Sequence, residues 1–212
     1  MNRWLLHPAA KPVVFLLALL PFATLLGGAL TDSLGANPAE ALIRGTGEWA
    51  LRCLWLTLAV TPLRLWFGWA ALLRLRRMLG LFTFFYALLH FTAYAWLDQG
   101  FALEAILRDI AKRPFILVGT AALLAMLPLA ATSFNRAVRA LGGRRWQALH
   151  RVVYAVALLA LLHFLWMRAG KQLFGEVAVY GALLAVLLGA RLHAWRQRHR
   201  RSVLAAAAPG KG

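Results

Sequence analysis

Long apolar segments constrain this chain more than any other feature of its sequence. Several stretches run almost without charge for about 18 residues or more, which is the length an α-helix needs to cross a hydrocarbon layer about 30 Å thick. Hydrophobic residues make up 62% of the chain, against about 45 to 50% of an ordinary soluble domain. A water-soluble fold could not bury that much apolar surface, so we expect the bilayer to be the solvent.

Six such segments follow one another along the chain. They are too long for the strands of a membrane barrel and predict helices. Their bounds are about 12–30, 48–66, 79–97, 114–131, 147–167 and 173–192. The sequence therefore predicts an all-α membrane protein, a six-helix transmembrane bundle that forms one domain over residues 1–192. Residues 193–212 are first basic and then alanine-rich, and we expect this tail to lie on anionic lipid or to be disordered.

The charged residues lie in the short connections between these segments. A formal net charge of +17 is compatible with nucleic-acid binding only if the charge gathers on a soluble face, and here it does not. With the N-terminus in the cytoplasm, 17 of the 24 lysines and arginines are cytoplasmic and all seven acidic residues lie on the opposite side. The positive-inside rule then predicts that both termini are cytoplasmic, and no nucleic-acid partner is expected.

Several kinds of cofactor site are excluded by the composition. Cys53 is the one cysteine, so disulfides, thiolate zinc sites, iron–sulfur clusters and covalently attached haem are ruled out. No connection exceeds about 20 residues, and neither a G-x-G-x-x-G nor a P-loop pattern occurs. Any metal centre must therefore rest on histidine, and the chemistry belongs to the helix bundle or to partners.

Two of the six histidines lie deep in apolar segments, where a polar side chain needs a partner. His90 follows Arg77 by 13 residues and His163 follows Arg151 by 12, so both lie roughly 18 to 20 Å beyond the last cytoplasmic arginine at about 1.5 Å per residue. Two imidazoles at one depth on different helices can bind an iron from opposite faces. The remaining histidines outside the apolar segments are His7, His193 and His199, for which a solvated role is expected.

His150 is a candidate for a second haem level. It precedes His163 by 13 residues, about 20 Å lower on the same predicted helix, near the cytoplasmic boundary. Thirteen residues rotate an ideal helix by about 220°, so the two side chains would not share a face of a straight helix. The equivalent position on the third helix is near Arg77 and Met78, which supplies no obvious second ligand.

Two other interpretations of these histidines stay open at this point. They could hydrogen-bond within the bundle, or they could relay protons in a proton-coupled transporter. No aspartate or glutamate occurs within any predicted helix core, which disfavours the transporter.

Several specific strings resemble the MsrQ (YedZ) family over residues 74–166. The strings are Arg76-Arg77-Met78-Leu79-Gly80-Leu81 ahead of His90, Lys112-Arg113-Pro114-Phe115-Ile116, Leu129-Ala130-Ala131-Thr132-Ser133, Trp146-Gln147-Ala148-Leu149-His150-Arg151-Val152-Val153-Tyr154 and Leu162-His163-Phe164. The resemblance implies a ferric-reductase-like transmembrane domain in the bacterial inner membrane that binds one or two haem b groups. It also implies a non-catalytic electron-transfer subunit, which takes electrons from the quinone pool or a cytoplasmic flavin reductase. Their acceptor would be a periplasmic molybdopterin subunit, MsrP, that repairs oxidised methionines.

The same resemblance assigns candidate ligands. The family's haem ligands carry over onto His90, His150 and His163, whereas related oxidases have two histidines on each of two helices. Arg77 and Arg151, at the cytoplasmic rim, are candidates to bind haem propionates or an anionic flavin or quinone headgroup, and positive-inside anchoring is the alternative. The family is also described as binding FMN, although no pattern here identifies a flavin site. A stand-alone ferric reductase is a further alternative.

Overall fold

The computed structural model describes residues 5–170, 172 and 174–207 and is built from helices. Their bounds are Ala10–Leu30 (α2), Pro38–Phe67 (α3), Leu73–Ala93 (α4), Leu103–Lys112 (α5), Pro114–Ala131 (α6), Asn135–His150 (α7), Val153–Ala169 (α8) and Phe174–Ala207 (α9), with a short 3₁₀ turn at Ala70–Leu72 (η1) and a π-helical turn at Tyr94–Asp98 (η2). No strand occurs in these residues. Six helical stretches are long and apolar enough to cross a membrane, so the predicted six-helix all-α membrane fold is confirmed.

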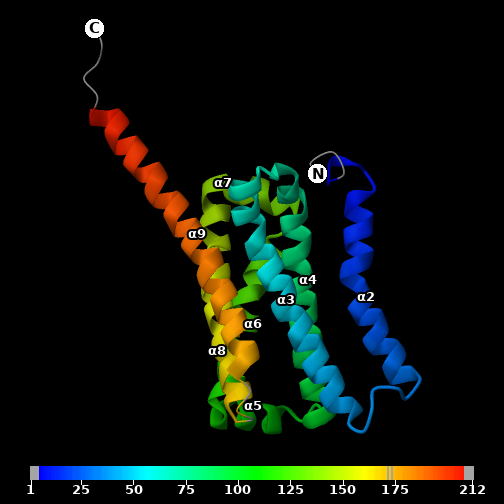
Figure 1. Ribbon diagram of the computed structural model, residues 1–212. Coiled ribbons are helices and arrows are strands. Elements are labelled where there is room, and N and C mark those ends of the chain that lie inside the picture. Colours follow the sequence, from blue (N-terminus) through cyan, green and yellow to red (C-terminus); the bar gives the residue numbers. More distant parts are fainter. Residues whose placement is uncertain (1–4, 171, 173, 208–212) are drawn as a thin grey trace.

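The helices run up and down between two ends of a bundle (Figure 1). α2 begins and α9 ends at the upper end, where α7 also lies, whereas α5 lies across the lower end. We call the upper end, with η1 and the arginine-rich α7, the basic end, and the lower end, with residues 31–37 and 98–113, the mixed-charge end. An even number of crossings places both ends of the helical chain on one side of the bundle.

Several helices begin and end where local residues dictate. Asn37 caps α3, because its side chain accepts a hydrogen bond from the Glu40 backbone N–H at 3.1 Å, and Pro38 occupies the first turn. Gly68 ends α3 with a φ of 67°, a conformation that glycine adopts without strain. Pro114 opens α6 in the same way that Pro38 opens α3.

The bundle contains two closely packed helix pairs. α3 lies along α4, and α6 lies along α8, with α9 covering α3 and α8. The core between α3, α8 and α9 includes Leu58 and Val156, which are 1% and 0% exposed. The Trp55 indole on α3 also donates a hydrogen bond to the backbone carbonyl of Tyr180 on α9 at 3.0 Å. Around this core many large apolar side chains are exposed, as expected of a protein whose solvent is hydrocarbon.

A proline within α3 creates a backbone acceptor that another helix satisfies. Pro62 has no N–H, so the carbonyl of Leu58, four residues earlier, lacks its helical donor. Arg191 of α9 donates to that carbonyl and also to the Tyr154 hydroxyl of α8 at 2.7 Å. Because an unpaired carbonyl is costly in a bilayer, Arg191 stabilises the contact of α9 with α3 and α8.

The first helix is held to the bundle by a comparable contact. Next to Pro21 of α2, the Phe22 N–H donates to the Tyr86 hydroxyl at 3.1 Å, and that hydroxyl donates to the Ala18 carbonyl at 2.6 Å. The Tyr86 hydroxyl of α4 thus lies between the Phe22 N–H and the Ala18 carbonyl, which would otherwise form a helical hydrogen bond with each other. Tyr86 is 0% exposed, while most of α2 is not covered by protein.

Tyr86→Phe is expected to loosen α2 from the bundle. The two hydrogen bonds of the hydroxyl are lost and the direct bond between the Phe22 N–H and the Ala18 carbonyl replaces one of them, so the expected loss of stability is that of one hydrogen bond, about 0.5 to 1.5 kcal/mol. Thermal unfolding in detergent measures the change, and limited proteolysis between α2 and α3 reports its location. An unchanged midpoint together with an unchanged cleavage rate would contradict the anchoring role.

Candidate functional site

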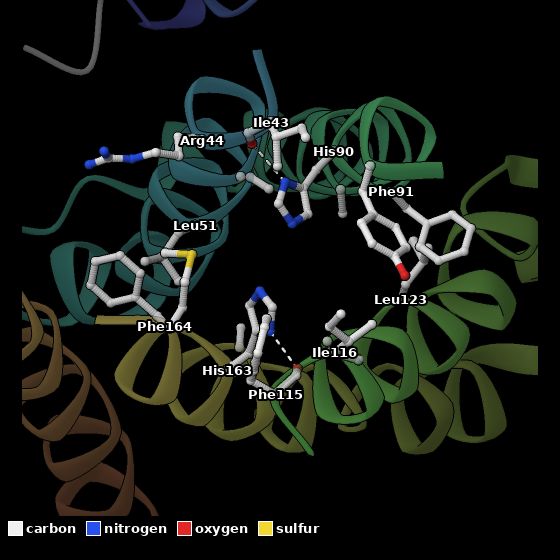
Figure 2. Close-up of a pocket in the computed structure, with 18 of the residues that line it drawn as sticks. Ile43, Arg44, Leu51, His90, Phe91, Phe115, Ile116, Leu123, His163 and Phe164 are labelled. Carbon is white, nitrogen blue, oxygen red and sulfur yellow. Dashed lines mark hydrogen bonds between the residues drawn. The ribbon is translucent and has the colours of Figure 1, made fainter. Parts of the chain in front are cut away.

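His90 and His163 face each other across the inside of the bundle (Figure 2). His90 lies in the last turn of α4 and His163 in the second half of α8. The centroids of their rings are 6.0 Å apart, and the ring planes are inclined by 74°. The structure thus brings together the two histidines that the sequence analysis placed at one depth.

Each of these rings is tethered to a backbone carbonyl of the neighbouring helix. The Nδ1 atom of His90 is 2.8 Å from the carbonyl oxygen of Ile43 on α3, and that of His163 is 2.6 Å from the carbonyl oxygen of Phe115 on α6. A carbonyl only accepts hydrogen bonds, so each Nδ1 must be the protonated nitrogen. In a neutral ring Nε2 then carries a free lone pair. In Figure 2 this second nitrogen of each ring points toward the other ring.

The spacing of the rings suits a metal bound between them. Two metal–nitrogen bonds of about 2 Å, plus about 1 Å from each nitrogen to its ring centre, place ring centroids about 6 Å apart. The observed 6.0 Å matches that sum. Two imidazoles are too few to hold a bare ion, and no group of three histidine, cysteine or acidic side chains suited to a metal occurs in the part of the chain that the structure describes. Haem fits this donor set, because its porphyrin supplies the other four nitrogens.

A cavity surrounds the two rings and has room for a flat apolar group. Its volume is about 480 Å³, and α3, α4, α6 and α8 supply most of its wall. Apolar side chains line most of it, including Leu51, Leu123 and Met126. Charged side chains lie toward the mixed-charge end, which is the distribution expected around a macrocycle with an apolar body and anionic substituents.

Arg168 closes the charged side of this cavity. It is 2% exposed and pairs with Glu48 at 3.2 Å and with Glu176 at 2.8 Å, while Glu48 also pairs with Arg52 at 3.0 Å. These ion pairs connect α8 to α3 and α9 beside the cavity. Arg168 directly follows the predicted segment 147–167, and nothing in its position in the sequence indicates that its side chain turns toward the inside of the bundle.

His150 lies apart from this pair. It is the last residue of α7, and α8 begins at Val153, so the structure places a turn at Arg151 and Val152 between His150 and His163. Arg151 and Val152 nevertheless keep right-handed helical angles, so His150 and His163 lie on one membrane span, as predicted, and the non-helical break within α7 is at Gly142. The ring of Trp146 stacks on that of His150, with centroids 3.9 Å apart. Both ring nitrogens of His150 are buried without a hydrogen-bond partner, and the ring does not line the cavity.

Arg77 and Arg151 lie at the basic end and do not line the cavity either. Arg77 is exposed and donates to the Asn135 side-chain oxygen at 2.6 Å, whereas Arg151 is exposed in the turn between α7 and α8. Arg151 directly follows His150 in the chain, and Arg77 lies close enough for its charge to act on the His150 ring.

Comparison with known proteins places this arrangement in a family. Residues 46–161 match the family described as ferric reductase like transmembrane component. That region includes His90 and His150 and ends two residues before His163. A protein of Polaromonas naphthalenivorans called the protein-methionine-sulfoxide reductase haem-binding subunit MsrQ is 58% identical over 201 residues, 94% of this chain and 92% of the relative. The chain belongs to the MsrQ family.

Other MsrQ relatives extend over a similar length. The haem-binding subunit MsrQ of Herminiimonas arsenicoxydans is 52% identical over 92% of this chain and 90% of its own. That of Ralstonia nicotianae is 52% identical over 95% and 93%. These alignments cover nearly the whole bundle, so the MsrQ family membership extends beyond the central region. No solved structure matches the chain.

Proposed function

We propose that this chain is a haem b electron-transfer subunit of a methionine sulfoxide reductase system, placed in the bacterial inner membrane with both termini in the cytoplasm. The facing imidazoles of His90 and His163, 6.0 Å apart in an apolar cavity, are the observation that carries the proposal. The relatives, each called a haem-binding subunit of a methionine sulfoxide reductase, support it. The gathering of basic residues at one end of the bundle supports the orientation.

In this proposal His90 and His163 bind the iron through Nε2. The carbonyls of Ile43 and Phe115 keep Nδ1 protonated and hold each ring in its orientation. A haem held by both imidazoles in addition to its four porphyrin nitrogens would supply one-electron transfer and would leave no open position for a substrate. Sulfoxide reduction therefore belongs to a periplasmic molybdopterin partner, MsrP, that meets the mixed-charge end.

Electrons enter this chain at the basic end, from the quinone pool or a cytoplasmic flavin reductase. His150 is the proposed ligand of a second haem there, and its two buried, unpartnered ring nitrogens support that role. Arg77 and Arg151 lie at the same end and are proposed to pair with anionic groups of that haem, a quinone or FMN. Flavin released on denaturing the purified protein would test the FMN assignment directly.

The first test is the visible spectrum of the protein purified in detergent from haem-replete cells. We expect a Soret band and an α band that sharpens on reduction. The reduced protein should be fully re-oxidised when a catalytic amount of MsrP is added with methionine sulfoxide, and not by the sulfoxide alone. A colourless protein would refute haem binding, and a haem protein that MsrP leaves reduced would refute the proposed acceptor.

A stand-alone ferric reductase is the second candidate function, because the matching family model is described as ferric reductase like. External ferric chelates separate the two functions in the same apparatus. Re-oxidation by chelates without MsrP would favour the ferric reductase, whereas re-oxidation that needs MsrP and a sulfoxide favours the relay.

A further inference from the structure

Two glycines lie directly against the facing histidines. A Cβ atom added to Gly47 of α3 would lie 2.9 Å from Nδ1 of His90. A Cβ atom added to Gly119 of α6 would lie 2.8 Å from Nδ1 of His163. Both distances are shorter than a carbon atom tolerates, so each imidazole occupies space that only glycine leaves open.

The two contacts repeat one arrangement. Each imidazole donates to the carbonyl four residues before its glycine, Ile43 before Gly47 and Phe115 before Gly119. In an α-helix that carbonyl also accepts the glycine's own N–H, and its second lone pair is free for the imidazole. The glycine and the carbonyl one turn earlier thus form a seat for the ring, once between α3 and α4 and once between α6 and α8.

Backbone conformation does not explain these glycines. Both lie inside helices, and neither is among the residues with positive φ. Glycine within a helix costs stability relative to alanine. The close approach of the imidazole is therefore the feature that requires glycine here.

We propose that Gly47 and Gly119 are positioning residues that set the orientation of the two iron-binding imidazoles. The inference rests on the proposed haem site. A methyl group at either position pushes the ring away from the carbonyl and weakens the Nδ1 hydrogen bond. The Nε2 atom then no longer points toward the position proposed for the iron. Such outer partners of metal ligands commonly change metal affinity about 10- to 100-fold.

Gly47→Ala and Gly119→Ala test the proposal in the purified full-length protein, and the chain offers matched controls. A Cβ atom on Gly80 of α4 would meet only a Thr57 methyl at 3.8 Å, and one on Gly181 of α9 only a Leu161 methyl at 3.9 Å. We expect haem affinity to fall about 10- to 100-fold in the two test variants and to stay unchanged in Gly80→Ala and Gly181→Ala. Haem that is retained should show an altered low-spin EPR signal, which reports the angle between the ligand planes, and a shifted midpoint potential.

A second comparison separates positioning from a general packing role. In a His90→Ala background the ring is gone, so adding Gly47→Ala should not lower the thermal stability of the apoprotein further. An equal loss of stability with and without the imidazole would overturn the proposal, as would test variants whose affinity, EPR signal and potential match those of the controls. A wild-type protein without haem would instead refute the proposed function, so the two failures are distinguishable.

Discussion

His163→Ala is expected to remove most of the haem from the purified protein. One of the two imidazoles that would hold the haem is lost, and His90 is the one other histidine among the described residues that line the cavity. The expected loss of haem affinity is more than about tenfold, since even outer partners of a ligand contribute that much. A pyridine haemochrome assay per mole of protein measures it, and His90→Ala should behave alike.

Chemical rescue makes this prediction specific. Free imidazole is small enough to fill the space left by the missing ring, so it should restore a low-spin spectrum to His163→Ala. His7→Ala is the matched control, because His7 is exposed and far from the cavity along the chain. A wild-type spectrum in His163→Ala would contradict the ligand assignment, and an equal loss of haem in His7→Ala would indicate general misfolding.

The pairing of His90 with His163 was within reach of the sequence because depth in a membrane helix follows from residue counting. Each residue adds about 1.5 Å along the axis, so the similar distances of 13 residues from Arg77 and 12 from Arg151 predicted similar heights. Counting residues gives the height of each histidine in the membrane, but it does not show which helix faces lie against each other. The 6.0 Å approach depends on how α4 and α8 pack with α3 and α6.

The backbone contacts that hold the two rings could not be predicted by counting residues. Ile43 is 47 residues from His90, and Phe115 is 48 residues from His163. A hydrogen bond between side chain and backbone of different helices leaves no local pattern in the sequence. An apolar residue followed four positions later by glycine is the only trace, as in Ile43 to Gly47, and such pairs are common in membrane helices.

The six spans followed directly from hydropathy, but the helices at the two ends did not. α5 mixes polar and apolar residues and is too short to span, so it looked like part of a connection. α7 is rich in arginine, so its part before residue 147 did not stand out in hydropathy. The difference in helical phase between His150 and His163 stands, because Arg151 and Val152 form a helical turn that continues α7 into α8.

His150→Ala is expected to lower the haem content from about two per chain to about one and to leave the facing pair intact. The ring lies outside the cavity of that pair, and its buried nitrogens have no partner among the described residues. The proposed second haem would be the nearest acceptor for a donor at the basic end, and the variant lacks it. His150 lies about 20 Å from the level of His163 along the helix axis. Reduction by that donor should become much slower.

Small reductants that reach both sides of the bundle separate loss of a relay step from loss of the whole site. Dithionite should still reduce the haem that remains in His150→Ala, and its spectrum should match that of the wild-type pair. His193→Ala, an exposed histidine of α9, is the control and should keep both haems. A wild-type content of one haem, retained in His150→Ala, would refute the second site. It would leave the buried His150 ring, stacked on Trp146, with a purely structural role at the end of α7.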